Sequence, residues 1–195
     1  MSEKVSIGIL AVQGAFAEHQ AMLDGLGADT FLIRQKKDLE EAVQNGRLQG
    51  IVLPGGESTV QGKLLRDLGM SDQLKELIEA GTPVLATCAG LILLAERVSN
   101  DDRAYLKTLP VSVKRNAYGR QLGSTILRGS FAGMEDVPMP FIRAPYIYKT
   151  GTGVEILSER QGFVTAARQD KMLATAFHPE MTEDIRVHEY FLKMI

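Results

Sequence analysis

The sequence predicts an α/β fold, a single three-layer domain in which helices cover both faces of a central, mainly parallel β-sheet. In the first half of the 195-residue chain, short apolar runs alternate with segments of helical spacing. Near-continuous apolar strands separated by helices are typical of parallel sheets that are buried on both faces. The length suits one domain, and no repeat or Pro- or Ser-rich linker interrupts residues 1–195.

The elements of the first half follow from residue type and spacing. Runs of β-branched and aliphatic residues predict strands, and apolar residues three or four apart predict helices. We expect strands at Val5–Val12, Thr30–Ile33, Gly50–Leu53 and Pro83–Thr87, and helices at Ala15–Leu26, Leu39–Val43, Ser58–Leu68, Ser71–Ala80 and Ala89–Ala95. The connections between parallel strands should be right-handed.

The second half is richer in short strands separated by turns. We expect these at Pro110–Arg115, Gln121–Leu127, Phe141–Ala144, Val154–Leu157, Phe163–Arg168 and Met172–Phe177. The last two should form a hairpin. A closing helix is predicted over Thr182–Met194, with Thr182 as its N-cap and Glu183 and Asp184 in its first turn.

Composition excludes several classes of protein. Hydrophobic residues make up 45% and charged residues 24% of the chain, and the net charge of −2 gives no reason to expect nucleic acid or an anionic membrane as a partner. The apolar stretches are shorter than the roughly 20 residues of a membrane helix, and the N-terminus lacks the features of a signal peptide. A lone cysteine forms no internal disulfide, so we expect a cytoplasmic protein.

Histidine spacing argues against a metal site. The chain has three histidines, and none lies at a ligand spacing from another or from the cysteine. His19 and His188 lie in helical patterns among polar residues, and we interpret them as ordinary helix residues. We therefore expect no metal.

The single cysteine lies where a nucleophile would be displayed. The pattern Ala86-x-Cys88-x-Gly90 joins a predicted strand to a predicted helix, with small residues two positions before and after the cysteine. This strand-turn-helix elbow exposes a reactive side chain above a parallel sheet. The alternative is that Cys88 is only a small buried apolar residue.

A base is needed beside this cysteine. A free thiol with a pKa near 8.5 is only about 3% ionised at pH 7. The N-terminus of the following helix contributes roughly 0.3–1 kcal/mol, or about 2 at best, which lowers the pKa by about 1.5 units or less. The helix alone is therefore a weak activator.

His178 is the best candidate for that base. Pro179 pushes it towards an extended conformation, in which Glu180 would lie on the same side and orient the imidazole. The alternative is a loop histidine beside an exposed glutamate.

The loop that follows the third predicted strand contains two successive glycines, Gly55 and Gly56. Such a loop can turn backbone N–H groups towards a ligand, as an oxyanion hole requires. A phosphate-binding P-loop is excluded because Lys63 is followed by Leu64 and position 57 is Glu57. The Gly151–Gly153 segment likewise lacks the third small residue of a dinucleotide fingerprint.

Together these segments resemble the class I, triad-type glutamine amidotransferase family, through Pro54–Ser58, Thr87–Gly90 and His178–Glu180. Further segments are similar to one branch, the glutaminase subunits of pyridoxal 5′-phosphate synthase: Leu10–Ala15, Gly55–Thr59, Arg115–Gln121, Phe141–Pro145 and Phe177–Asp184. The resemblance extends from Ile7 to the C-terminal helix.

The resemblance implies a flavodoxin-like amidotransferase fold and hydrolysis of L-glutamine to glutamate and ammonia, without a cofactor. Ammonia would pass to a separate lyase subunit that builds pyridoxal phosphate. In this scheme Cys88 is the nucleophile, His178 transfers protons and Glu180 orients His178. The N–H groups of Gly56 and Ala89 would form the oxyanion hole. The substrate-binding residues would be Gly56, Glu57, Ser58, Arg115, Ile142 and Arg143, with the two arginines holding the substrate carboxylate.

Two alternatives stay open. One is a glutaminase or cysteine hydrolase of the same fold that serves another pathway, and the other is a binding module without catalysis. We also expect the Gly55–Gly56 peptide to be able to flip, so that the isolated chain is a poor glutaminase and the partner raises its activity.

Overall fold

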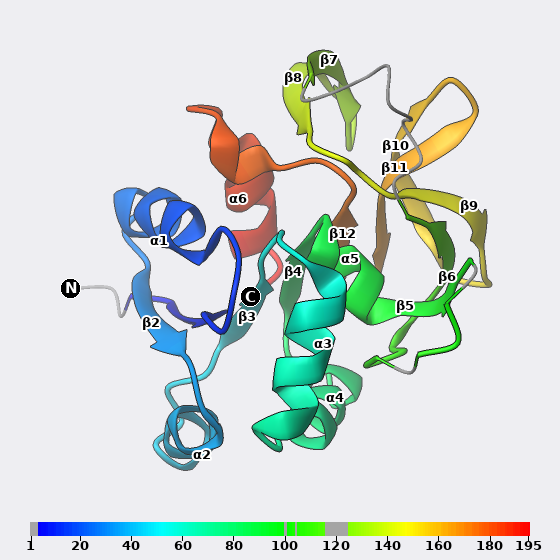
Figure 1. Cartoon of the computed structure of the whole chain (residues 1–195). Coiled ribbons are helices and arrows are strands. Elements are labelled where there is room, and N and C mark those ends of the chain that lie inside the picture. Colours follow the sequence, from blue (N-terminus) through cyan, green and yellow to red (C-terminus); the bar gives the residue numbers. More distant parts are fainter. Residues whose placement is uncertain (1–3, 100, 104, 116–124) are drawn as a thin grey trace.

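The computed structural model describes residues 4–99, 101–103, 105–115 and 125–195. Its main sheet has a parallel half in the strand order β2-β1-β3-β4-β12 (Figure 1). These strands span Ser6–Leu10 (β1), Asp29–Ile33 (β2), Gly50–Leu53 (β3), Val84–Thr87 (β4) and Met172–Thr175 (β12). The predicted α/β class with a mainly parallel central sheet is confirmed.

The other half of the sheet is largely antiparallel. From β12 the order continues β11-β9-β6-β5, with β10 pairing to β11, and only β5 and β6 run parallel. These strands span Ala95–Val98 (β5), Leu109–Lys114 (β6), Tyr146–Thr150 (β9), Glu155–Arg160 (β10) and Phe163–Gln169 (β11). The predicted hairpin before His178 is confirmed as β11 and β12, whereas β5 and β9 were not expected.

The helices are Phe16–Gly25 (α1), Lys36–Gln44 (α2), Ser58–Asp67 (α3), Ser71–Glu79 (α4), Ala89–Leu94 (α5) and Arg186–Leu192 (α6). Helices α1 and α6 lie together through a contact between His19 and His188, apart from α3 and α4 (Figure 1). None of the helices in the described ranges is long and apolar enough to span a membrane.

The strands of the parallel half form the centre of the hydrophobic core. Every residue of β1, β3 and β4 is buried, as expected for strands that are covered on both faces. The largest fully buried side chains include Phe131, Phe177 and Phe191, which come from the later part of the chain and pack onto this centre. The carboxyl ends of the parallel strands are therefore held on a rigid support.

The strand predicted at Phe141–Ala144 is wrong in its bounds. The strand is β8, Met134–Phe141, and it ends where the prediction begins. It pairs with β7 (Thr125–Phe131), in a separate two-stranded sheet. Prolines are tolerated in such edge strands, so the two prolines of β8 did not prevent pairing. Ile142 to Ala144 consequently lie in a loop.

The closing helix is also shorter than predicted. Helix α6 begins at Arg186 with Ile185 at its N-cap, so Thr182 is not the cap. The Thr182 hydroxyl instead accepts a hydrogen bond from the Asp184 N–H (3.2 Å), and the Asp184 carboxylate accepts from the Arg186 N–H (3.0 Å). These local bonds favour turns over helix.

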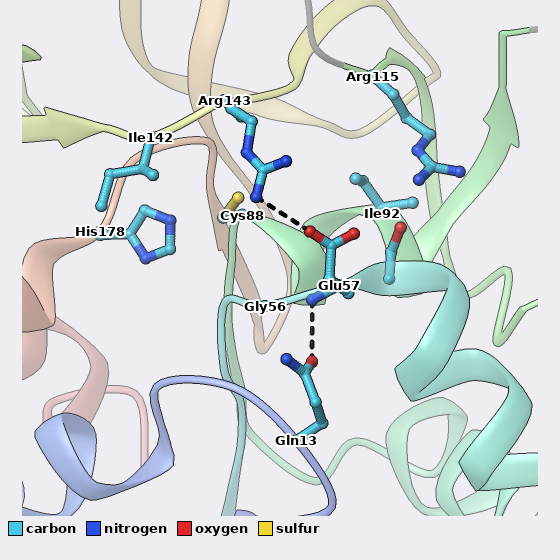
Figure 2. Close-up of a pocket in the computed structure, with 10 residues that line it drawn as sticks. Gln13, Gly56, Glu57, Cys88, Ile92, Arg115, Ile142, Arg143 and His178 are labelled. Carbon is cyan, nitrogen blue, oxygen red and sulfur yellow. Dashed lines mark hydrogen bonds and ion pairs between the residues drawn. The ribbon is translucent and has the colours of Figure 1, made fainter. Parts of the chain in front are cut away.

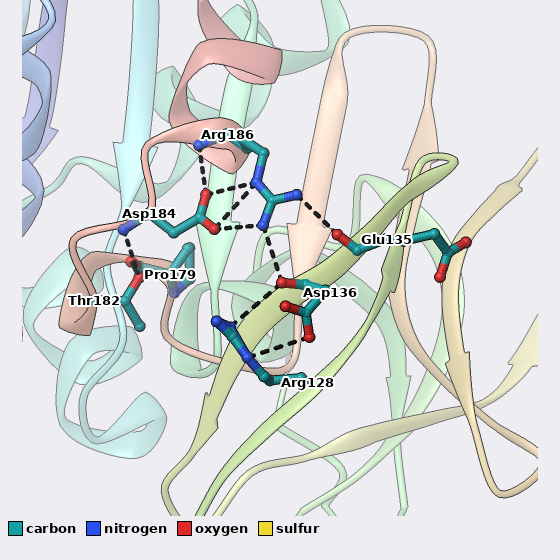
Figure 3. A network of polar contacts seen from close by, with 7 residues as sticks. All are labelled: Arg128, Glu135, Asp136, Pro179, Thr182, Asp184 and Arg186. Atoms are coloured by element: carbon teal, nitrogen blue, oxygen red, sulfur yellow. Dashed lines mark hydrogen bonds and ion pairs between the residues drawn. The ribbon is translucent and has the colours of Figure 1, made fainter.

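An arginine connects this turn to the β7–β8 hairpin. The Arg186 guanidinium bonds to the Asp184 carboxylate and donates to the carbonyl oxygens of Glu135 (2.9 Å) and Asp136 (3.0 Å) (Figure 3). Arg128 also contacts the Asp136 carboxylate. In addition, the His178 N–H donates to the Pro140 carbonyl at 2.9 Å. The segment that carries His178 is thereby attached to the hairpin that leads into Ile142.

Candidate active site

Cys88 lies in the turn between β4 and α5 with a strained backbone. Its φ of 47° and ψ of −96° fall in a region that residues with a Cβ rarely adopt. The Cys88 N–H donates to the Thr175 carbonyl at 2.8 Å, which holds the turn against β12. This is the geometry expected of a nucleophile elbow.

The need for small residues on either side of Cys88 has a direct steric cause. A Cβ at Gly90 would lie 2.1 Å from the Leu53 carbonyl oxygen. Ala86 is fully buried in β4, opposite Leu53 of β3 and Ala174 of β12. The start of α5 therefore crosses the sheet so closely that only glycine fits at position 90.

His178 and Glu180 are in contact, as predicted. Nδ1 of His178 lies 2.7 Å from Oε1 of Glu180, and both residues are buried. The expected extended backbone is wrong, however, because Pro179–Met181 forms a 3-10 turn (η1). This turn, with proline at its first position, brings the carboxylate back under the imidazole. The ring packs on Gly55, where a Cβ would lie 2.2 Å from its Cε1 atom.

The environment favours a charged pair. Burial lowers the pKa of His178, but hydrogen bonding to the Cys88 thiol and to Glu180, together with their charges, outweighs burial and raises the pKa to about 10. Burial raises the pKa of Glu180, but His19 and His178 outweigh it and lower the pKa below its usual value. His178 is thus held as an imidazolium between Cys88 and a carboxylate.

The predicted residues surround one cavity of about 360 Å³ (Figure 2). Cys88 and His178 line it together with all the predicted substrate-binding residues, which are Gly56, Glu57, Ser58, Arg115, Ile142 and Arg143. Glu180 lies behind His178, and Ala89 starts α5 directly after Cys88. The segment 116–121, part of the Arg115–Gln121 motif, lies outside the described residues.

The glycine loop is held from the β1–α1 connection. The Ala15 N–H donates to the Gly55 carbonyl at 3.0 Å, and the Glu57 N–H donates to Oε1 of Gln13 at 2.9 Å. A Cβ at Gly56 would lie 2.5 Å from that same Gln13 oxygen. The carbonyl of the Gly55–Gly56 peptide is therefore turned towards Ala15, and its N–H points the opposite way because the peptide is trans.

The two arginines differ in how firmly they are held. Arg115 donates from Nη1 to the Asp101 carboxylate at 3.1 Å, and its side chain is 25% exposed. Asp101 also binds Arg103, which with Arg115 lowers the pKa of Asp101 to about 2. Arg143 is 78% exposed, contacts Glu57 at 3.3 Å and has a positive φ of 44°. Within the described part of the chain, Arg115 contacts Asp101 through one of its nitrogens, and a guanidinium has further N–H donors for a substrate anion.

Sequence reasoning missed Gln13 and Ile92, which also line the cavity. Both had a signal. Ile92 follows Cys88 by four residues, one helical turn, and Gln13 follows β1 at the sheet edge where ligands bind in α/β folds.

His19 was also misinterpreted. It is fully buried, and its Nε2 atom lies 3.4 Å from Oε2 of Glu180. His188 is likewise fully buried, whereas the sequence pattern indicates ordinary helix residues among polar neighbours for both. Among the described residues, no group of three or more His, Cys, Asp or Glu side chains could hold a metal ion.

Comparisons with known proteins agree with this geometry. The model of the SNO glutamine amidotransferase family matches residues 9–195. The chain is 53% identical over 189 residues to the pyridoxal 5′-phosphate synthase subunit PdxT of Desulfitobacterium hafniense (strain Y51), which covers 97% of this chain and 92% of the relative. It is 52% identical to the subunit of the same name from Methanocorpusculum labreanum, with 97% of each chain covered.

Solved structures show the same fold. A crystal structure described as a glutamine amidotransferase superposes with a TM-score of 0.89 at 39% identity, covering 96% of this chain and 97% of the other. A glutamine amidotransferase from Thermotoga maritima superposes with a TM-score of 0.66 at 14% identity, covering 98% of this chain and 84% of the other. The second likeness concerns the fold alone.

Proposed function

This chain belongs to the SNO glutamine amidotransferase family, and from that premise we propose that it hydrolyses L-glutamine to L-glutamate and ammonia. One observation carries the proposal. A cysteine on a strained elbow opens into a cavity of about 360 Å³ beside a histidine whose second nitrogen lies 2.7 Å from a buried carboxylate. Cysteine, histidine and a carboxylate in this order form a nucleophile, a base and its orienting group.

The first half-reaction breaks the amide bond of the substrate. Nδ1 of His178 faces Glu180, which leaves Nε2 for the thiol of Cys88. Nε2 of the His178 imidazolium already holds the proton of the Cys88–His178 pair, so the sulfur attacks the side-chain carbonyl carbon of glutamine directly and a C–S bond forms. The carbonyl oxygen becomes an oxyanion that the N–H groups of Gly56 and Ala89 bind. When the C–N bond breaks, His178 gives its proton to the leaving ammonia.

The second half-reaction releases glutamate. Water attacks the γ-glutamyl thioester on Cys88 while His178 accepts one of its protons. The C–S bond then breaks, and the proton stays on Nε2 of His178 beside the sulfur, which restores the starting pair. Glu180 stays ionised throughout, because it stabilises the imidazolium form of His178 in both halves.

The rest of the cavity suits the free amino acid. Arg115 and Arg143 would bind the α-carboxylate, for which a guanidinium is the preferred partner. Glu57, whose carboxylate contacts Arg143, is placed to bind the α-ammonium group. Ser58 and Ile142 complete the wall of the pocket. Free glutamine should therefore be preferred to glutamine within a peptide.

The partner follows from the relatives, which are subunits of pyridoxal 5′-phosphate synthase. We assign the chain as the glutaminase subunit of such a synthase, acting in the cytoplasm and delivering ammonia to the lyase subunit. The glycine loop gives this partner a point of control, because the Gly55–Gly56 peptide can present either its N–H or its carbonyl to Cys88 at little steric cost.

Ammonia release from glutamine should be measured with the chain alone and with a saturating amount of the synthase lyase subunit. Glutamine hydrolysis that rises when the lyase subunit is added supports the proposal. No hydrolysis of glutamine in either condition rejects it, and hydrolysis of other amides at equal rates favours a different hydrolase of this fold. Equal glutaminase rates with and without the lyase subunit would reject control of the Gly55–Gly56 peptide by the partner. They would not affect the proposed hydrolysis by the triad.

A further inference from the structure

A buried histidine pair lies behind the carboxylate of Glu180. His19 of α1 and His188 of α6 are both fully buried, and Nδ1 of His19 lies 2.9 Å from Nε2 of His188. The other nitrogen of His19, Nε2, lies 3.4 Å from Oε2 of Glu180 and 3.1 Å from the hydroxyl oxygen of Thr87. Neither histidine takes part in the two half-reactions of glutamine hydrolysis.

The chemistry of the contacts decides where the protons lie. An ionised carboxylate only accepts hydrogen bonds. Oε2 of Glu180 is buried and has no regular hydrogen bond from any residue that the structure describes, and Nε2 of His19 is its ion-pair contact. Nε2 of His19 must therefore carry a proton, because an unprotonated Nε2 would place its lone pair against a lone pair of the Glu180 carboxylate. The Thr87 hydroxyl oxygen, which accepts from the Gly55 N–H at 3.0 Å, is the second acceptor for this proton.

The remaining proton of the histidine pair lies on His188. With Nε2 of His19 protonated and the ring neutral, Nδ1 of His19 accepts from the Nε2–H of His188. Nδ1 of His188 is buried and has no hydrogen-bond partner among the described residues, and in this arrangement it is a bare acceptor. That is less costly than an N–H donor left unpaired in the same position.

Burial favours the neutral form of both rings. It lowers the pKa of His19 despite the opposing effect of Glu180, and it lowers the pKa of His188 to about 3. A single directed chain of donors thus runs from His188 through His19 to Glu180, whose other oxygen faces His178.

We propose that His19 is a positioning residue of the triad: its Nε2–H holds Oε2 of Glu180, so that Oε1 stays directed at Nδ1 of His178. This inference rests on the proposed glutaminase function for its kinetic consequences, but not for the position of the proton. Through Thr87, the same nitrogen also contacts the hydroxyl that binds Gly55. The orientation of the carboxylate and the anchoring of the oxyanion loop therefore share one buried donor.

The test compares two substitutions of His19 in the full chain with the synthase lyase subunit present. His19→Met fills the space without a donor, whereas His19→Gln keeps an N–H near the position of Nε2. We expect His19→Met to lower kcat about tenfold to a hundredfold, as is usual for residues that orient a functional group, with little change in KM. His19→Gln should recover most of this loss.

The pH profile separates positioning from a general loss of stability. The titratable groups that influence one another in the triad and the histidine pair are Cys88, His178, Glu180, His19, His188 and Glu18. Without the donor, the Glu180 carboxylate is protonated more easily, so the acid limb of kcat/KM should move to higher pH in His19→Met.

Leu23→Ala is the matched control for that profile. Leu23 lies one turn further along α1 and is fully buried. The control should lower the melting temperature without moving the acid limb.

Wild-type kcat and an unmoved acid limb in His19→Met would overturn the inference, as would His19→Gln behaving no better than His19→Met. If His19→Met does not fold, ¹⁵N NMR of the wild-type imidazoles decides. We expect His19 as the neutral Nε2–H tautomer at pH 7 to 8, and an Nδ1–H tautomer or an imidazolium there overturns it. A wild-type chain that fails to hydrolyse glutamine rejects the proposed function and leaves the NMR result standing.

Discussion

Nδ1 of His178 lies 2.7 Å from Oε1 of Glu180, two residues further along the chain in a 3-10 turn. A short contact between residues this close in sequence requires little of the tertiary fold. The fold supplies what the turn cannot, namely burial of both groups and the elbow that brings Cys88 to the other side of the imidazole.

Replacing Glu180 with Gln should lower kcat by roughly 10⁴-fold, by analogy with the third member of other triads. The amide keeps the shape of the side chain but loses the charge that supports the imidazolium. Glutamine binding, measured by calorimetry on the inactive Cys88→Ala background, should be nearly unchanged. Normal turnover in Glu180→Gln would reduce the site to a Cys–His pair.

The raised pKa of His178 predicts how stability depends on pH. The folded state retains a proton on His178 up to about pH 10, whereas the unfolded chain loses it near pH 6.5. Between these values the folded state binds more protons, so stability should fall as pH rises, by at most about 1.4 kcal/mol per pH unit for one proton. Below pH 6.5 this contribution is fully present.

Glu180→Gln is the control for this pH effect, because it removes a charge that raises the pKa of His178. Urea unfolding at several pH values should give a steeper decline for the wild type than for the variant. Identical curves would contradict the assigned ionisation.

Arg115→Ala and Arg143→Ala should weaken glutamine binding more than they slow catalysis. A hydrogen bond to a charged group contributes about 1.5–3 kcal/mol, so KM should rise about tenfold to a hundredfold. Arg115, which Asp101 holds in place, should matter more than the exposed Arg143. Equal hydrolysis of free glutamine and of glutamine within a peptide would exclude a carboxylate clamp.

Gly90→Ala should destabilise the fold, because its Cβ would lie 2.1 Å from the Leu53 carbonyl oxygen. Overpacking of this kind costs typically 1–3 kcal/mol, so we expect a loss of about that size. Gly25→Ala is the matched control, since nothing lies within 4 Å of its added Cβ at the end of α1. Its stability should be unchanged or higher by about 0.4–1 kcal/mol. Equal stabilities of the two variants would refute the steric account of the elbow.

The parts of the site that the sequence predicts are those set by local rules. The elbow depends on a strand, a turn and a helix that are consecutive in sequence, and His178 and Glu180 are two residues apart. Cys88, Gly90 and the Gly55–Gly56 loop were therefore visible as patterns, and all three lie at the carboxyl edge of the parallel strands.

The parts that escaped prediction depend on long-range partners. The strand Tyr146–Thr150 forms because β6 and β11 offer it edges to pair with, which its own residues do not reveal. His19 meets Glu180 only because α1, α6 and the η1 turn pack together. Its polar neighbours in sequence gave no sign of this contact, because tertiary packing decides which residues meet.

The most direct test of the central claim is to measure glutamine hydrolysis by Cys88→Ala in the presence of the synthase lyase subunit. In parallel, acid-quenched reactions of the wild type are analysed by mass spectrometry for a γ-glutamyl thioester on Cys88. The thioester should be detected on the wild type, and Cys88→Ala should fold normally and retain less than about a thousandth of the activity, because nothing else in the cavity replaces the nucleophile. Activity of Cys88→Ala above that level, with no thioester on the wild-type chain, would contradict the assignment of Cys88 as the nucleophile.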